Sequence, residues 1–589
     1  MAIAASALPK VQGGAFLLEP RSPEEIFTPE DFTSEHLAIA RTAEEFWKQE
    51  IEPHLEEIHQ LAPGAALSVL RKAAELGLTA ISIPERFGGM ELDLASAVIV
   101  AERLGRDGSY AGWHGAHTGI GTLPILFFGT EDQKQRYLPK LATVELLAAY
   151  CLTEPHAGSD ALAARTRADL SPDGSHYVLS GQKMWITNGG AADLFIVFAK
   201  VAGVELTAFI VERAFPGVSS GAEEKKMGIK GSSTTAIYFD NVRVPKENLL
   251  GEIGRGHIIA FNILNVGRLK LGPFAVGGSK HVLALSLKYA KERKAFGHSI
   301  ADFGLIRHKL AEMAIRTFAA ESMTYRVVGL IEARLEGFAW DQPDAPRAML
   351  KAIEEYAAEC SMVKVWASEA LDYVVDEGVQ IHGGYGYHQD YAVERAYRDS
   401  RINRIFEGTN EINRLLITGM LLKRAQRGQL ALVQAAQAVL AEILSGPASD
   451  SAPEEDRLVS NAKKIALMLM GLAYQKYLAA LEQQQEILAA IADIIMEIFA
   501  MESTLLRARK LAALGKAGPA ADMAAVFLRD AMGRIEAAAR PVLAATSEGD
   551  ALRANMAVLR RFARFEPVDA IALRRRIALR LLEAERYLV

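Results

Sequence analysis

Cysteine is scarce in this chain of 589 residues: only Cys151 and Cys360 are present, without metal-ligand spacing. Two distant cysteines predict no disulfide framework and no metal site, and they favour a reducing compartment. No run of about 18 apolar residues occurs, so the sequence predicts no membrane span. The first arginine is Arg21, and no charged segment precedes the short apolar run at the N-terminus. That pattern is a poor targeting signal, so we expect a cytoplasmic protein.

An excess of positive charge is also missing. The chain has 66 basic and 72 acidic residues, and its net charge is −6. This balance gives no support for nucleic-acid binding, although a few local arginines can still hold a phosphate. Half of the residues are hydrophobic and 23% are charged, which is typical of a globular protein with an ample core.

The hydrophobic period changes along the chain. Residues 35–150 carry apolar side chains at helical spacing, and helical spacing returns in long segments from 255 to 425. Between them lie four short β-rich runs, at 177–179, 194–198, 206–211 and 236–239. Runs at this spacing suggest a small barrel or sandwich.

A stretch rich in Gly, Pro and Ser at 445–453 predicts a linker before an Ala- and Leu-rich end of the chain. We therefore expect a mainly α fold with a central β-domain and an extra C-terminal helical domain. The expected domains are an N-terminal helical domain (1–150), a central β-domain (151–254), a helical catalytic domain (255–425) and a C-terminal helical extension (426–589).

Glu407 is the candidate catalytic residue, in the segment RINRIFEGTNEI at 401–412. Thr409 can cap the helix that follows, and Glu411 suits its first turn. Gly408 leaves space beside the carboxylate for a substrate. The apolar neighbour Phe406 can raise the pKa of Glu407, so that it acts as a base near neutral pH. From this pattern alone, a solvated cap residue is the alternative.

Two upstream segments bear on that choice: YCLTEPHAGSD at 150–160 and GQKMWITNGG at 181–190. Together with the Glu407 segment, they resemble the acyl-CoA dehydrogenase family. A third pair, EKKMGIK at 224–230 and FDNVRVP at 239–245, resembles the very-long-chain branch, which carries a C-terminal helical extension. The resemblance covers about residues 35 to 425, and beyond that it is one of length and helical character.

The resemblance implies FAD as the cofactor and a β-domain between two helical domains. Thr187 would bond the flavin near its reactive nitrogen, Thr153 would bond its pyrimidine edge, and Trp185 would form an aromatic wall. The residues alone also allow ordinary strand positions, with Trp185 in the core. The expected cofactor-binding residues are Tyr150, Leu152, Thr153, Gly158, Ser159, Trp185, Ile186, Thr187, Arg293, Phe296, Gln380, Gly383, Gly384, Thr409 and Glu411.

Arg293, close before Phe296, can bind a pyrophosphate bidentately, and similar enzymes use this arginine on the flavin of the neighbouring subunit. The glycine turn at Gly383 and Gly384 lets the backbone approach a diphosphate. A solvated helix end and a plain turn are the alternatives. We expect at least a dimer, and favour a homodimer because the extra domain could cover a surface used in tetramers. Gly304 stands where the family often has glutamine.

For the substrate, Arg268 matches a family arginine near the thioester, and its charge would lower the pKa of Glu407. Of the arginines before Glu407, Arg398 or Arg401 is expected to face the CoA. The expected substrate-binding residues are Ser159, Asn265, Arg268 and Gly408. Small residues at Gly112, Gly115, Ala116, Gly119 and Gly121 leave room for a long acyl chain, with close helix packing as the alternative.

The resemblance implies FAD-dependent α,β-dehydrogenation of long-chain acyl-CoA to trans-2-enoyl-CoA in fatty-acid β-oxidation, with electron-transferring flavoprotein as the acceptor. An acyl-CoA oxidase and an assembly or scaffold protein of the same fold are the alternatives. In the C-terminal region, isoleucines between Ile487 and Ile498 have the spacing of a buried helix. The basic segment from Arg574 to Arg580 is the better surface candidate, with at most weak peripheral membrane contact.

Overall fold

The computed structural model describes residues 8–445, 452–516 and 518–589. Its N-terminal part is helical, as predicted, and capping explains where several helices begin. Thr33 accepts from the backbone of His36 at the start of α1, and Thr130 and Gln133 form a capping box at the start of α7. The helices are α1 (Ser34–Phe46), α2 (Leu55–His59), α3 (Ala65–Glu75), α4 (Leu94–Leu104), α5 (Gly108–Gly115), α6 (Leu123–Phe128) and α7 (Glu131–Ala142).

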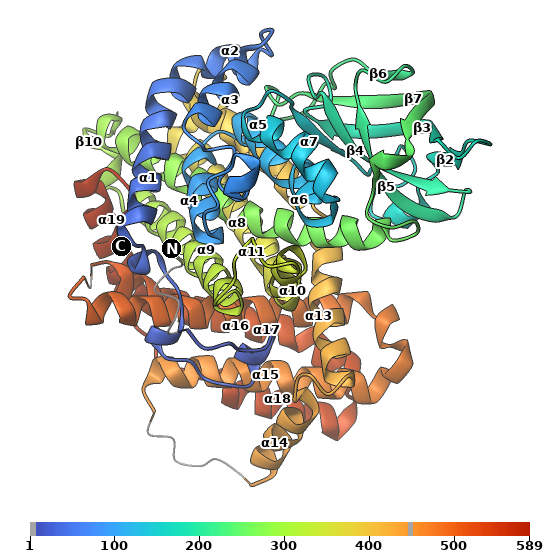
Figure 1. Ribbon diagram of the computed structural model, residues 1–589. Coiled ribbons are helices and arrows are strands. Elements are labelled where there is room, and N and C mark those ends of the chain that lie inside the picture. Colours follow the sequence, from blue (N-terminus) through green and yellow to red (C-terminus); the bar gives the residue numbers. More distant parts are fainter. Residues whose placement is uncertain (1–7, 446–451, 517) are drawn as a thin grey trace.

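The first eight strands form one mixed sheet, which lies to one side of the helices (Figure 1). The order is β6-β7-β3-β2-β4-β5-β8, with β1 parallel to β4. All four β-rich runs of the sequence lie in strands of this sheet. The strands are β1 (Ala148–Cys151), β2 (Arg167–Leu170), β3 (His176–Thr187), β4 (Leu194–Val201), β5 (Glu205–Glu212), β6 (Val218–Ser220), β7 (Thr234–Pro245) and β8 (Leu249–Leu250).

Long helices form the centre of the molecule. The 37-residue α8 packs along α9 and α11, and the short hairpin β9–β10 follows its end. These elements are α8 (Gly256–Glu292), β9 (Lys294–Ala295), β10 (His298–Ser299), α9 (Gly304–Arg334), α10 (Ala345–Glu355), α11 (Ala357–His382), α12 (Ala392–Ser400) and α13 (Asn410–Gln426).

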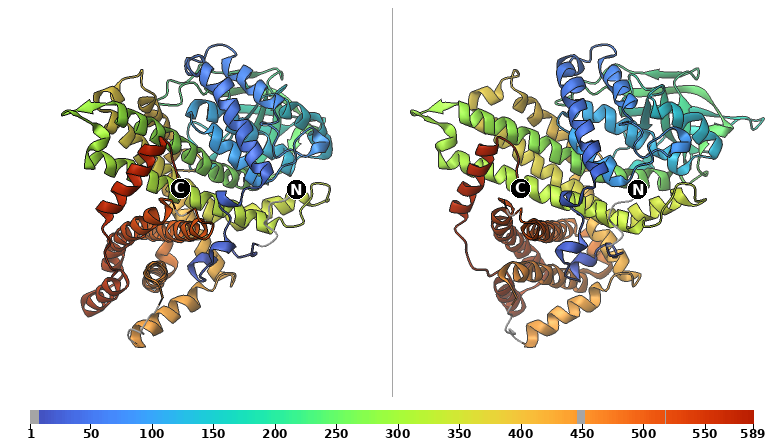
Figure 2. Two further views of the ribbon diagram at one scale, coloured as in Figure 1. Left: turned by 90° about the vertical axis from the view of Figure 1, so that its left-hand side faces the viewer. Right: turned by 60° about the vertical axis from the view of Figure 1, so that its left-hand side comes forward.

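The C-terminal helices pack beneath this central layer (Figure 2). The predicted isoleucine helix is α16, and its five isoleucines are buried, which confirms that it is a core helix of the extra domain. The predicted linker falls between α14 and α15, and residues 446–451 of it lie outside the described residues. The helices are α14 (Leu432–Ser445), α15 (Glu454–Tyr477), α16 (Gln485–Ala513), α17 (Ala520–Thr546), α18 (Gly549–Phe562) and α19 (Ala570–Ala584).

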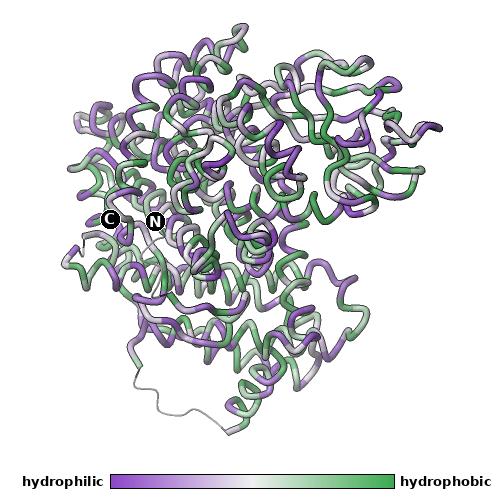
Figure 3. The backbone as a smooth tube through the Cα atoms, in the orientation of Figure 1, coloured by the Kyte–Doolittle hydropathy of each residue, from purple (hydrophilic) through white to green (hydrophobic). Residues whose placement is uncertain are grey.

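Hydropathy alternates within the helices rather than collecting in one long segment (Figure 3). Across the part of the chain that the structure describes, none of the helices combines the length and apolarity that a membrane crossing needs. In the basic segment of α19, Arg574 pairs with Glu312 and Arg576 pairs with Asp522. Two of the arginines predicted to form a surface for partners are therefore held in ion pairs.

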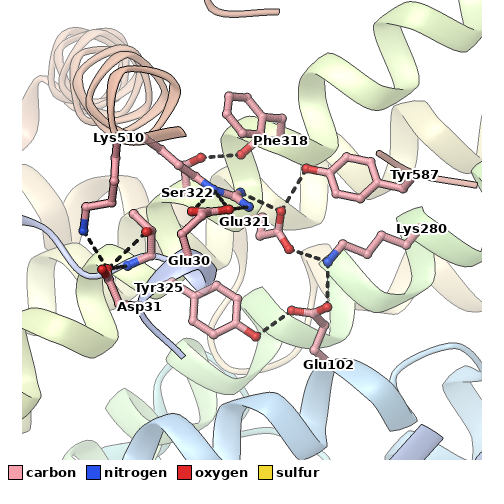
Figure 4. A network of polar contacts seen from close by, with 12 residues as sticks. Glu30, Asp31, Glu102, Lys280, Phe318, Glu321, Ser322, Tyr325, Lys510 and Tyr587 are labelled. Carbon is pink, nitrogen blue, oxygen red and sulfur yellow. Dashed lines mark hydrogen bonds and ion pairs between the residues drawn. The ribbon is translucent and has the colours of Figure 1, made fainter. Parts of the chain in front are cut away.

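A buried polar network joins the C-terminal domain to the rest of the molecule (Figure 4). Arg507 of α16 forms ion pairs with Glu30, at 2.9 Å, and with Glu321 of α9, at 2.6 Å. The hydroxyl of Tyr587 also donates to Glu321, at 2.8 Å. Lys280 of α8 forms an ion pair with Glu321 as well. Buried charges need such complete pairing, so the network fixes how α16 sits against α8 and α9.

Candidate active site

Two cavities meet at Glu407. The larger, of about 1800 Å³, lies between β3, α8 and the segment that leads into α13. The smaller, of about 150 Å³, lies behind it, between α8 and the helical segment from Gly105 to Gly119. The residues that line both are Ile120, Thr187, Ile229, Ile402, Phe406 and Glu407. A molecule that reaches from one cavity into the other must therefore pass the Glu407 carboxylate.

The loop that carries Glu407 has an unusual backbone. Glu407 has φ +57° and Gly408 has φ +79°, so two consecutive residues are left-handed, which costs free energy for a glutamate. The Oγ1 atom of Thr409 accepts from the backbone N–H of Ile412 and caps α13, as predicted. The side chain of Asn413 donates to the carbonyl of Gly408 at 2.8 Å.

Two cations from neighbouring helices hold the same loop. Arg268 of α8 donates from Nε to the carbonyl of Glu407 at 3.2 Å. Lys364 of α11 donates from Nζ to the carbonyl of Gly408 at 2.8 Å and to Oδ1 of Asn410 at 2.6 Å. These contacts fix the strained loop, as preorganised functional sites require.

The Glu407 carboxyl has the electrostatics of a base. Its Oε2 atom is buried and has no hydrogen-bond partner. Burial raises the pKa of Glu407 to about 7, although Arg268 and Lys364 both oppose the rise. The opposing effect of Arg268 has the predicted direction. A pKa near neutrality suits a group that takes up a proton at physiological pH.

The predicted cofactor residues divide into two groups. The first group lines the larger cavity and consists of Tyr150, Leu152, Thr153, Gly158, Ser159, Trp185, Ile186, Thr187 and Thr409. β3 bulges between Lys183 and Ile186, and Trp185 there has φ +61° and is 54% exposed. The alternative that Trp185 lies in the core is therefore wrong.

This wall fits a flavin. Trp185 supplies an aromatic surface, and the hydroxyls of Thr153 and Thr187 lie in the same cavity. The hydroxyl of Tyr150 is buried without a hydrogen-bond partner, although buried polar groups are nearly always paired. A ligand with a planar ring and a polar edge would satisfy these groups together.

The second group lies away from both cavities. Arg293 lies over the ring of Tyr385, 5.6 Å from its centroid, and thus beside the turn at Gly383 and Gly384. Phe296, on the hairpin after α8, is 92% exposed. The structure therefore brings Arg293 to the turn but not to the cavity of its own chain. Glu411 lies in the first turn of α13, as predicted, and outside both cavities. The cofactor roles of both groups stay predictions, including those of Arg293, Phe296, Gln380, Gly383, Gly384 and Glu411.

The predicted substrate residues Ser159, Asn265, Arg268 and Gly408 all line the larger cavity. Arg398 and Arg401 line it as well, while Arg404 pairs with Asp372 at 3.3 Å. Gly112, Gly115, Ala116 and Gly119 line the smaller cavity. Gly121 does not, because a Cβ atom on it would lie 2.7 Å from the Cβ of Ala148. At Gly121 the prediction of an open pocket is wrong, and close packing explains the glycine.

Several residues of the site were not predicted from the sequence, among them Gly267, Lys364 and Asn413. Gly267 directly precedes Arg268, so its position offered a signal. Lys364 is a lysine within an otherwise apolar stretch of α11, which is a weaker signal. Both cysteines are buried and free. Across the described residues, no group of three or more His, Cys, Asp or Glu side chains could hold a metal.

A buried base at the junction of two cavities, between a β-domain and a helical bundle, is suited to take a proton from a bound substrate. Acyl-CoA dehydrogenase family models match the N-terminal domain at 33–145, the middle domain at 149–242 and the C-terminal domain at 254–422. A further C-terminal domain model of the family matches residues 461–561. The chain belongs to the acyl-CoA dehydrogenase family, which confirms the prediction from the sequence.

Similar proteins extend over the whole chain. A probable acyl-CoA dehydrogenase of Bacillus subtilis (strain 168) is 50% identical over 585 residues, 98% of both chains. A crystal structure of an acyl-CoA dehydrogenase complexed with FAD from Bacillus anthracis has a TM-score of 0.96 at 51% identity. The match covers 98% of this chain and 100% of the B. anthracis chain, so the predicted fold class is confirmed. The human mitochondrial very long-chain specific acyl-CoA dehydrogenase is 41% identical over 391 residues, 63% of this chain and 57% of the relative.

Proposed function

We propose that the chain oxidises long-chain acyl-CoA thioesters to trans-2-enoyl-CoA in fatty-acid β-oxidation, with FAD as cofactor and Glu407 as base. The position of Glu407 at the junction of the two cavities carries this proposal, because it places a base where a head group meets an acyl chain. The B. anthracis relative is complexed with FAD, which supports the cofactor. The human relative is specific for very long chains, which supports the substrate class.

The two cavities suit the two ends of such a thioester. Exposed cations, Lys351, Lys423 and Arg427, lie along the larger cavity and suit the phosphates of CoA. The apolar and small side chains of the smaller cavity suit an acyl tail.

The residues around Glu407 then have definite tasks. Oε2 of Glu407 takes the α-proton, and its unpaired state leaves it free to do so. Arg268 and Lys364 hold the loop and favour the ionised carboxylate before the transfer. Thr153, Trp185 and Thr187 would hold the flavin ring, which when bound supplies the acceptor for the β-hydride. Loss of the proton and the hydride leaves the trans double bond.

The same proposal includes a second copy of the chain and electron-transferring flavoprotein as acceptor. Phe296 is 92% exposed and Leu305 is 80% exposed, both close to Arg293 in sequence. Exposed apolar side chains that follow a predicted phosphate-binding arginine in the sequence support contact with a partner copy. Light scattering of the FAD-loaded protein should give at least the mass of a dimer, and a monomer would count against this arrangement. The cytoplasmic location stays a prediction of the sequence.

Anaerobic mixing with palmitoyl-CoA tests the proposed function. The yellow flavin should bleach, and reoxidation should need electron-transferring flavoprotein rather than oxygen. Glu407→Gln should keep FAD and bind substrate but lose bleaching and exchange of the α-proton. Glu482→Gln, an exposed glutamate of the C-terminal domain, is the control. Normal turnover in Glu407→Gln would overturn the base assignment, and rapid oxygen uptake without an added acceptor would favour an oxidase.

A further inference from the structure

Lys270 is a cation in the wall of the smaller cavity. It lies on α8 three residues beyond Gly267, the residue that faces the Glu407 carboxylate. Three residues correspond to about 4.5 Å along the helix axis, just under one turn. The face continues with Phe274 and Gly278, which also line the cavity. Lys270 therefore stands beside the path of an acyl chain that has passed the base.

The ammonium group of Lys270 faces the opposite wall. A Cβ atom on Gly119 would lie 3.6 Å from its Nζ, so the group reaches across to the π-helical turn η8 (Ala116–Gly121). Its hydrogen bond there runs to Oγ1 of Thr118 at 3.5 Å, which is at the limit for such a bond. The Thr118 hydroxyl itself donates to the carbonyl of His114 at 2.9 Å. Thr118 is thus a weak partner, with lone pairs and no charge.

Apart from the base Glu407, the other charged groups of this wall have partners. Arg106 forms an ion pair with Glu44, and the carboxylate of Asp399 accepts from the backbone N–H of Ile229. Within the described residues, no carboxylate forms an ion pair with Lys270. Burial lowers the pKa of Lys270 to about 8, with no neighbouring acid acting against it.

An ammonium group without a counter-charge is costly in a cavity, and an apolar acyl chain beside it makes the cost larger. An apolar side chain at position 270 would not carry this cost. The nearby histidines do not supply a counter-charge, because burial holds the pKa of His114 at about 3 and that of His117 at about 4. Within the described residues, the wall around Lys270 therefore supplies no counter-charge in contact with its ammonium group.

We propose that Lys270, with the hydroxyl of Thr118, forms a subsite for a carboxylate on the acyl chain. The substrates would then include acyl-CoA thioesters with a second, distal carboxyl group. This rests on the proposed acyl-CoA function and narrows its substrate class. The ammonium supplies a charge-assisted hydrogen bond to the carboxylate, and the remainder of the cavity packs the methylene groups. Lys270 in this assignment determines specificity and takes no part in proton abstraction.

The test compares ω-carboxyacyl-CoA with unsubstituted acyl-CoA of equal length, from six to twelve carbons. In the wild-type holoenzyme, kcat/KM for the carboxylate series should peak at one length. In Lys270→Met, kcat/KM for the ω-carboxyacyl-CoA of that length should fall at least about tenfold relative to kcat/KM for the unsubstituted acyl-CoA of equal length. This is the size expected for a lost charged hydrogen bond. Lys288→Met, an exposed lysine on the same helix, is the matched control and should leave the ratio unchanged.

Binding supplies a second readout that does not depend on turnover. The ω-carboxy-2-enoyl products should bind more weakly to Lys270→Met by a similar factor in calorimetry, and Lys270→Arg should restore most of the affinity. The subsite proposal would be overturned if Lys270→Met left the ratio of kcat/KM between the two substrate series unchanged at every length. Unchanged product binding would overturn it as well. If neither series bleaches the flavin, the proposed function fails; if only the unsubstituted series does, the subsite alone fails.

Discussion

Gly267 and Glu407 are in direct contact across the site. A Cβ atom on Gly267 would lie 2.7 Å from Cδ of Glu407 and 3.2 Å from its Oε1. Real Cβ atoms essentially never come so close to a carboxyl carbon, so a side chain at position 267 would force the Glu407 carboxylate to shift. The carboxylate therefore lies against the helix that also carries Arg268, and its position is set by this packing.

Gly267→Ala should displace the carboxylate without removing it. A misplacement of about 1 Å can cost about 100-fold in rate, so flavin bleaching by palmitoyl-CoA should slow by that order. Stopped-flow absorbance under anaerobic conditions measures the rate. Gly419→Ala on α13 is the control, because a Cβ atom there meets no neighbour within 4 Å. Bleaching at the wild-type rate in Gly267→Ala would show that the contact does not set the geometry.

The pH dependence of turnover should report the ionisation of Glu407. Only the carboxylate form takes a proton, and burial raises its pKa to about 7, so kcat/KM should rise through about pH 7. Lys364 lowers that pKa through its charge, although burial lowers the pKa of Lys364 itself to about 7 and so weakens the effect. Lys364→Met should therefore move the acidic limb to higher pH, and Lys364→Arg should move it back. An acidic limb that stays in place in Lys364→Met would contradict the electrostatic role.

Lys364→Met should also weaken the fold, because it removes two hydrogen bonds from a buried ammonium to Gly408 and Asn410. A hydrogen bond to a charged group contributes about 1.5–3 kcal/mol, so the free energy of unfolding should fall by at least that amount. Denaturant titration of the holoenzyme measures the loss separately from the pH profile.

The features that the sequence predicted depend on residues close together in the chain. The cap at Thr409 needs only the next three residues, and the change from helical to β spacing is visible in any short window. The β-rich runs in β3, β4, β5 and β7 were found for that reason. Arg268 was found because the family motif around it is local.

The features that were missed or wrong depend on contacts between distant segments. Lys364 reaches Gly408 across 44 positions, and its local pattern gives no sign of that partner. Trp185 was expected at the flavin wall only through the family resemblance, because its strand pattern alone gives no sign of the bulge in β3 that turns it into the cavity. Gly121 belongs to the same run of small residues as Gly119, but it packs on Ala148. Periodicity cannot distinguish a glycine that makes space from one that permits packing.

The depth of the acyl cavity can be tested at Gly119, which lines its wall. Gly119→Gln places a side chain in the path of the distal part of a long chain. It should reduce kcat/KM for a C16 substrate about 10- to 200-fold more than for a C8 substrate, the range for lost contacts in a hydrophobic pocket. Gly533→Gln on α17 is the control, since a Cβ atom there meets nothing within 4 Å. Equal losses at both lengths would remove this segment from the pocket.

Arg507 should be critical for the attachment of the C-terminal domain. Its side chain is 1% exposed and forms ion pairs with Glu30 and Glu321, so Arg507→Met leaves two carboxylates with less compensation. Breaking a buried ion pair by removing one partner costs about 3–5 kcal/mol. Arg553→Met, which breaks an ion pair between largely exposed side chains, is the control and should have little effect. Denaturant unfolding of the holoenzyme compares the free energy of unfolding of the two variants. In Arg507→Met, limited proteolysis should cut first in the segments that connect the helices after α13. Equal stability of the two variants would mean that apolar packing, such as Phe16 on Phe499 at 4.9 Å between ring centroids, is sufficient to hold the domain.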